Sequence, residues 1–208
     1  MSAKDLHVLR SYLARLSVQQ LSDLRETRDV LPHLRPVNPA NPQATIDEIL
    51  CTLRSIRPKT RQLRRLASVY SWLIPQNLLP SWFLYRVDPM MAALGDFSLY
   101  KRLAFLIRMR CSPASLVCMA SPTGAYGCIV ALDPDSAQRN RHSVLPMYTW
   151  RGVPFMAVCI SGLQSVRRFR HLLTEVFERN HEEQLVGFYA DIDGAFAAAL
   201  QEVQSGRV

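Results

Sequence analysis

The fold is decided by residues 115–132, whose sequence is SLVCMASPTGAYGCIVAL. Two apolar runs, residues 115–120 and 125–132, flank the tetrapeptide Ser121-Pro122-Thr123-Gly124, which is typical of a hairpin turn. Before Pro113 the apolar residues recur at helical spacing, and after it they recur at the spacing of strands. This switch predicts helices in the N-terminal half, followed by an antiparallel β-meander.

Further strands are expected toward the C-terminus. Residues 144–150 and 153–160 flank Arg151-Gly152, a plausible two-residue hairpin turn, and residues 184–190 form a fifth strand. A helix over residues 163–179 precedes that strand, and a last helix over 195–203 follows it with Asp193 as its cap. We predict at least four strands between residues 115 and 190, and none longer than three residues before Pro113.

The N-terminal half reads as a series of helices. Residues 3–30 are helical with a break near Ser17 or Ser22, and Ser17 with Gln20 matches a capping box. Prolines between residues 32 and 42 enforce an extended linker. Helices follow over residues 45–57, from a cap at Thr60 to Ile74, and over 97–110. We predict an α+β fold, with an N-terminal helical arm at 1–36 and a globular domain at 37–208, its helices within 45–110 and its sheet and further helices within 113–205.

The charge of the chain is uneven. The 208 residues carry a net charge of +8, and 49% of them are hydrophobic. Residues 1–110 hold 17 Lys+Arg and 8 Asp+Glu, or +9, whereas residues 111–208 hold 8 and 9, or −1. Only three of the 25 cations are lysine. Arginine suits phosphate and carboxylate recognition, so the excess favours a polyanionic partner. Arginine-rich codon usage in a GC-rich genome is the alternative.

The excess charge is concentrated in the segment 54–85, which contains no acid. Its cations are Arg54, Arg57, Lys59, Arg61, Arg64 and Arg65. Three of the arginines, at i, i+3 and i+4, share one helical face and could contact phosphates. Nearby Trp72, Trp82 and Tyr85 could stack on bases or lie at a lipid interface. The alternative is a solvated face whose aromatic residues are core. A second cluster at Arg167 and Arg168 is the other candidate polyanion contact.

Motifs for other chemistry are missing. The five cysteines form no CxxC pair, and the five histidines lack metal-ligand spacing. There is no P-loop, HExxH or Gly-x-Ser-x-Gly sequence, so no cofactor and no metal is predicted. The odd cysteine count and the lack of a signal peptide indicate a cytoplasmic, reducing setting without disulfides. His142, in an expected loop, is the best histidine for a site, and the carboxylates of Asp191 and Asp193 are weaker candidates.

The element order resembles that of GNAT-type acyltransferases across roughly residues 45–205: helices, a meander, then helix, strand, helix. The resemblance implies an acyl-CoA-dependent enzyme. The signature of that family, Arg/Gln-x-x-Gly-x-Gly/Ala, is missing, and the sequence from Ile160 to Ser165 stands in its place with one glycine.

The leading hypothesis is a non-enzymatic intracellular interaction protein, small and regulatory, that binds RNA or DNA through its basic helical half. Little base specificity is expected, because no recognisable reader of base edges is present. One alternative is the acyltransferase-like enzyme. Another is a protein-interaction adaptor, or a matrix-like protein at a membrane surface, that docks through Trp72, Trp82, Phe83 and Tyr85. The sheet half could support homo-oligomerisation.

Overall fold

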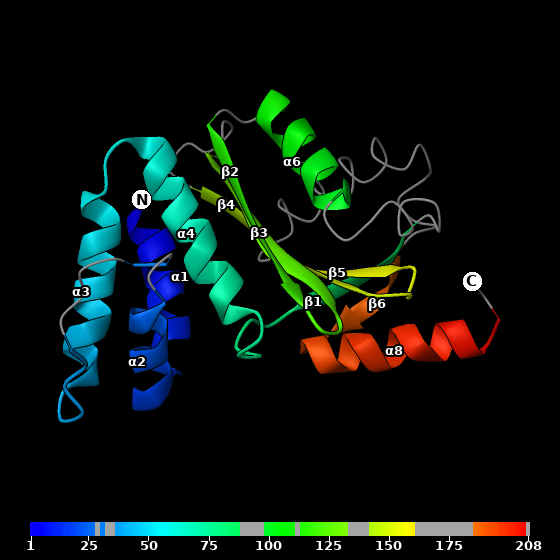
Figure 1. The fold of residues 1–208 in the computed structure, drawn as a ribbon, viewed down its shortest axis with the longest axis horizontal. Helices are drawn as coiled ribbons and strands as arrows, with labels where there is room; N and C mark the ends of the chain where they lie inside the picture. The colour runs from blue at the N-terminus through cyan, green and yellow to red at the C-terminus, as the bar shows by residue number, and fades with distance from the viewer. Residues whose placement is uncertain are drawn as a thin grey trace.

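The computed structural model describes residues 1–27, 30–31, 36–87, 98–110, 113–132, 142–160 and 185–206 (Figure 1). Its helices are α1 (Ala3–Leu13), α2 (Val18–Glu26), α3 (Pro42–Ser55), α4 (Lys59–Leu73), α6 (Ser98–Arg110) and α8 (Ile192–Gln204). Its strands are β1 (Trp82–Arg86), β2 (Ala114–Ser121), β3 (Gly124–Leu132), β4 (His142–Trp150), β5 (Phe155–Cys159) and β6 (Leu185–Tyr189). The α+β class is confirmed.

Local capping explains where the first helices begin. The Ser17 Oγ accepts a hydrogen bond from the Gln20 N–H (3.2 Å), and the Gln20 Oε1 accepts one from the Ser17 N–H (2.9 Å). The predicted capping box of α2 is therefore confirmed. Ser2 and Asp5 form the same arrangement at the start of α1. These reciprocal bonds satisfy amide groups that have no partner within the helix.

The next two helices begin differently from the prediction. Asn41 caps α3, and Pro42 occupies its first position, where the backbone N–H that proline lacks would have no partner within the helix. This helix therefore starts before residue 45. The expectation that Thr60 caps the following helix is wrong. Pro58 holds the cap position of α4 in extended conformation, and no side chain bonds to the first turn.

The N-terminal half also contributes a strand. β1 is five residues long and pairs with β5 on one side and β6 on the other, so the prediction of no strand longer than three residues before Pro113 is wrong. Its partners lie about 70 and 100 residues further along the chain, which is why the local pattern before Pro113 did not reveal it. The prediction of at least four strands after residue 115 is confirmed by β2 to β6.

The sheet has the strand order β2-β3-β4-β5-β1-β6, and its neighbouring strands are antiparallel. The predicted hairpin is present: Ser121 pairs with Gly124 across the turn between β2 and β3. The four strands β2 to β5 thus form a meander at one end of the strand order. β1, from the helical half, is inserted between that meander and β6.

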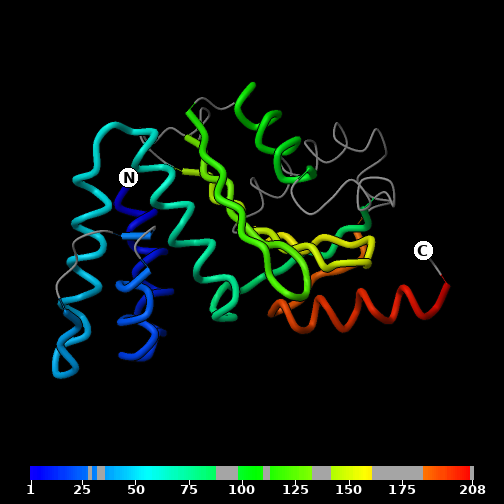
Figure 2. The backbone as a smooth tube through the Cα atoms, viewed as in Figure 1, coloured from blue at the N-terminus to red at the C-terminus, as the bar shows by residue number. Residues whose placement is uncertain are grey.

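The two faces of the sheet are buried in separate cores, and β5 shows the alternation. Phe155, Ala157 and Cys159 face the core formed with α1 to α4 and α8, whereas Met156 and Val158 face the core beneath α6. Successive side chains of a strand point to opposite faces, so every residue of β5 is buried. Figures 1 and 2 show α4 and α8 on one side of the sheet and α6 on the other.

Candidate polyanion-binding site

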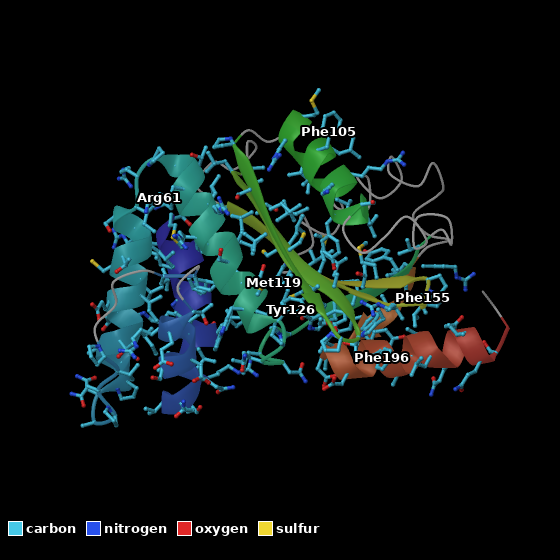
Figure 3. All side chains as sticks on the ribbon, in the orientation of Figure 1. Arg61, Phe105, Met119, Tyr126, Phe155 and Phe196 are labelled. Atoms are coloured by element: carbon cyan, nitrogen blue, oxygen red, sulfur yellow. The ribbon has the colours of Figure 1, made fainter. Side chains whose placement is uncertain are left out.

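Six cations gather where α3 ends and α4 begins. Arg54 lies in the last turn of α3, Arg57 in the connection, and Lys59, Arg61, Arg64 and Arg65 in the first two turns of α4. We call these six residues the basic corner. Figure 3 labels Arg61 near the upper end of α4, where the helical layer meets solvent. Cations that are spread over twelve positions of the sequence therefore share one end of the molecule.

The apolar face of α4 explains the outward direction of these side chains. Leu63, Leu66 and Val69 are buried against the sheet and the other helices. Arg61 and Arg64 are exposed, as the helical spacing predicted, and Arg65 is half-buried. Ser68, one turn after Arg64, is buried, and its Oγ donates to the Arg64 carbonyl (3.0 Å). A small hydroxyl that bonds to its own helix can enter a core at little cost.

Two of the six cations hold the corner together. The Arg57 guanidinium donates to the carbonyls of Arg54 (3.0 Å) and Ile56 (3.1 Å), which lie at the C-terminal end of α3. The Lys59 ammonium donates to the Gln62 Oε1 (2.8 Å), and the buried Gln62 amide donates to the Leu53 carbonyl (2.7 Å). The Arg57 bonds satisfy carbonyls at the end of α3, and the Gln62 amide joins α4 to α3.

Three arginines of the corner, Arg54, Arg61 and Arg64, are exposed and have no acidic partner within the described part of the chain. Arginines elsewhere in the structure do pair: Arg25 with Glu26 (3.0 Å) and Arg86 with Glu202 (3.5 Å). The three are thus available for an external anion.

The start of α4 is positively charged, although the charge of Asp5 acts on Lys59 and raises its pKa. α4 carries no acid in its first turn, and its N-terminal end presents the positive pole of the helix dipole. Burial lowers the pKa of Lys59, and the charge of Arg57 lowers it further. Cations at a helix N-terminus repel the dipole and one another, and a bound anion would relieve both interactions.

The other predicted contact residues lie either outside the described residues or inside the sheet and its cores. Arg167 and Arg168 lie outside the described residues. The expected docking segment around Trp82 is not an exposed surface, because β1 is an inner strand of the sheet: Trp82 is 1% exposed and Tyr85 is 0% exposed. The Trp82 indole donates to the Leu79 carbonyl (2.7 Å). Phe83 and Trp72 are half-buried against the two cores.

A buried contact between a histidine and a carboxylate was missed by the sequence analysis. His142 begins β4 rather than lying in a loop, and its Nδ1 is 2.7 Å from the Asp5 Oδ2 of α1. The side chain of His142 is 0% exposed and that of Asp5 is 10% exposed. The His142 Nε2 has no hydrogen-bond partner among the described residues. Since 137 positions separate the two residues, no local signal links them.

The pKa of Asp5 is set by opposing effects. Burial raises it, but hydrogen bonds from His142 and from Ser2 lower it more, so the net shift is downward from the ordinary value of 3.8. The carboxylate therefore stays charged beside His142 and accepts the Ser2 N–H (2.9 Å) as well. This pair ties α1 to the sheet, because Asp5 belongs to α1 and His142 begins β4.

The remaining candidates are structural in the described residues. Asp191, not Asp193, caps α8 by accepting from the Gly194 N–H (2.7 Å), and Asp193 accepts from the Asn77 amide (2.8 Å). The four described cysteines are free thiols, and Cys111 lies outside the described residues. No cluster of acids, histidines and cysteines suited to a metal ion occurs within these ranges. No helix among them is both long and apolar enough to cross a bilayer.

A surface hollow lies beside the basic corner, between α1 and α3. It encloses about 510 Å³ and is lined by Ala3, Leu6, His7, Arg10, Asp47, Leu50, Cys51, Arg54 and Ser55. Arg10 and Asp47 form an ion pair within it. Arg54 therefore belongs to the basic corner and also lines the hollow.

No protein-family model matches the sequence, and no curated protein matches it either.

Proposed function

We propose that this protein binds a polyanion, RNA or DNA, through the basic corner, as a non-enzymatic interaction protein. The observation that carries the proposal is the grouping of Arg54, Arg61 and Arg64, all exposed and without acidic partners in the described part of the chain. They lie on a frame in which the Gln62 amide joins α4 to the end of α3. Guanidinium groups offer forked donors that match phosphate oxygens. The frame lowers the entropic cost of collecting these charges when a ligand binds.

The alternatives receive less support. An acyltransferase-like enzyme would need a cleft with a polar group beside Cys128 and Val158, but both side chains are fully buried, each in an apolar core. The segment 161–165, which takes the place of the acyl-CoA signature, lies outside the described residues. An adaptor that docks through Trp82 and Tyr85 would need those side chains exposed, and both are buried.

The test compares two double variants that remove the same charge. Arg61→Gln/Arg64→Gln changes the corner, and Arg25→Gln/Arg86→Gln removes two arginines that already pair with acids. Binding of a labelled oligouridylate is followed by fluorescence anisotropy over a range of salt concentrations. Each lost phosphate contact should reduce the slope of log affinity against log salt by about 0.7, so the corner variant should lose roughly 1.4. The control should keep the parent slope.

Stability is measured on the same samples. Glutamine keeps helix propensity, and the two arginines lie off the apolar face, so the corner variant should lose no more than about 0.5 kcal/mol per site. A folded corner variant that binds the oligonucleotide with the parent affinity and slope would refute the proposal. Equal weakening by the corner and control variants would place the contacts elsewhere.

A further inference from the structure

The outer edge of the sheet at β2 is unusually open. β2 is eight residues long and lies at the end of the strand order, and among the described residues it pairs with β3 alone. Helices cover both of its faces, yet none of its residues is buried, whereas seven of the nine residues of β3 are. The exposure therefore comes from its free side. At such an edge the backbone N–H and C=O groups have no partner strand.

The register shows which groups point outward. The Leu132 N–H donates to the Pro113 carbonyl, and the pairing of β2 with β3 runs without a break from Ala114 to Ser121. In an antiparallel pair, alternate residues exchange both backbone bonds with the partner strand. The backbone groups of Leu116, Cys118 and Ala120 are then directed away from β3.

β2 also lacks the features that usually protect an edge. Natural sheets protect their edges with short strands, bulges, prolines or charged side chains. The sequence of β2, ASLVCMAS, has no charge and no proline, and its pairing shows no bulge. The other edge strand, β6, has only five residues and contains Gly187. β2 is thus a regular template of a length that suits the addition of another strand.

The surroundings of β2 have one sign of charge. α4 and α6 flank it, one on each face of the sheet (Figure 1). α4 contacts it through the Ser71 Oγ, which donates to the Val117 carbonyl (3.4 Å). Each helix carries four cations, and neither helix contains an acid, nor do β2 and β3. Any strand added here would lie between two positively charged helices.

Exposed apolar side chains accompany the charge. Met119 of β2 is 40% exposed, and on α6 Phe105 is 61% and Met109 is 73% exposed. Figure 3 shows Phe105 and Met119 on opposite sides of the sheet near this edge. A strand that pairs with β2 would place alternate side chains toward these two sides.

We propose that the β2 edge takes up an extended acidic segment of a partner protein, which adds a seventh strand to the sheet. Backbone hydrogen bonds to Leu116, Cys118 and Ala120 supply the pairing, and carboxylates of the segment meet the cations of α4 and α6. A second copy of this chain is a poor occupant, because β2-to-β2 pairing would bring two acid-free, cationic surfaces together. A nucleic acid cannot match the alternating N–H and C=O groups of a strand. This site goes beyond the polyanion binding proposed for the basic corner.

The test uses a synthetic peptide of alternating valine and glutamate. Its controls are polyglutamate, which has charge but little strand preference, and a peptide of alternating valine and lysine. Ala120→Pro removes an outward N–H at a position where an edge strand tolerates proline, and Ala120→Val is the matched control that keeps the N–H. We expect the valine–glutamate peptide to bind the parent and Ala120→Val alike, and Ala120→Pro about tenfold or more weakly. The valine–lysine peptide should not bind.

A second variant keeps the proposal testable if Ala120→Pro does not fold. Lys101→Glu/Arg108→Glu reverses two exposed charges of α6 and should weaken the valine–glutamate peptide by about tenfold or more. Ala120→Pro should bind oligouridylate as the parent does. Arg61→Gln/Arg64→Gln should lose the oligonucleotide, and because it removes two of the four cations of α4 it should also weaken the peptide, but less than the charge reversal on α6 does. Failure of the corner proposal would leave the peptide results intact, so the two failures are distinguishable.

Three results would overturn the proposal. Polyglutamate could bind as tightly as the alternating peptide, which would show that charge attraction, and not pairing with β2, holds the peptide. A folded Ala120→Pro could bind the peptide as tightly as Ala120→Val. Sedimentation could show a dimer of the parent that Ala120→Pro dissociates, in which case the occupant of the edge is a second copy of the chain.

Discussion

Replacing Asp5 with alanine should destabilise the protein strongly, because it removes the acceptor of a buried histidine. The His142 side chain is completely buried, and its Nδ1 lies 2.7 Å from the Asp5 Oδ2. No other hydrogen-bond partner of the His142 ring is present among the described residues. Removing the acceptor of a buried hydrogen-bonding group generally costs about 1–3 kcal/mol, since the group stays buried without a partner.

The capping box of α1 is lost in the same variant, because Asp5 also accepts the Ser2 N–H. Loss of a cap costs about 1 kcal/mol. The two effects meet at one carboxylate, so we expect a total of about 2–4 kcal/mol, or roughly 4–16 °C in Tm for a chain of this size. Ser17→Ala is the matched control: it removes the capping box of α2, at a site without a buried partner, and should cost about 1 kcal/mol.

The assay is urea unfolding followed by circular dichroism, with His142→Leu and the double variant Asp5→Ala/His142→Leu included. Replacing both partners with apolar groups leaves no buried polar group unpaired, so the double variant should be at least about 1 kcal/mol more stable than the sum of the single losses predicts. If Asp5→Ala costs no more than Ser17→Ala, or if the two single losses simply add, the pair does not hold α1 to the sheet.

The same pair gives a pH dependence with a definite sign. The pKa of Asp5 in the folded protein lies below its ordinary value of 3.8, so folding favours the carboxylate. The resulting stabilisation is fully present above the unfolded pKa and is lost as the pH falls through the folded pKa. The difference in unfolding free energy between the parent and Asp5→Ala should therefore shrink when the pH is lowered below about 4. A difference that grows in acid would contradict this assignment.

Two further predictions concern packing and thiols. A Cβ at Gly127 would lie 2.4 Å from a backbone oxygen of β2, so Gly127→Ala should cost about 1–3 kcal/mol in urea unfolding. A midpoint like that of the parent would show that β2 and β3 can move apart without loss of stability. In labelling with Ellman's reagent at pH 8, the exposed Cys51 should react first, whereas burial raises the pKa of Cys118 and of Cys159 to about 12 and should slow both; equal rates for all three would contradict the burial.

Features that depend on a few neighbouring residues could be predicted from the sequence. Ser17 and Gln20 are three positions apart, and their capping box formed as the spacing predicts. The turn at Pro122-Thr123 joins two strands whose alternation is visible in the sequence. The outer face of α4 was predicted from helical periodicity and holds for Arg61 and Arg64. In each case the deciding interaction spans at most a few turns of backbone.

The candidate site was predictable in composition but not in detail. The sequence shows six cations and no acids around them, but it does not show which of the six bond within the protein. Arg57 satisfies carbonyls at the end of α3, and Lys59 bonds to Gln62, whereas Arg54 and Arg61 have no acidic partner among the described residues. Those differences arise from the angle between two helices, which depends on packing against the rest of the chain.

The sequence by itself determined the first hairpin, the α+β class and the concentration of positive charge. The predicted helix over residues 163–179 lies outside the described residues, and the second hairpin closes through residues 151–154 rather than through Arg151-Gly152 alone. Only the tertiary structure decided that Trp82 lies in an inner strand, that His142 meets Asp5, and that β2 ends as the open edge of the sheet. Each of these depends on pairing between segments far apart in the chain. An apolar run such as Trp82–Arg86 can become a strand, a core helix or a surface patch, and the choice is made by the partner that buries it.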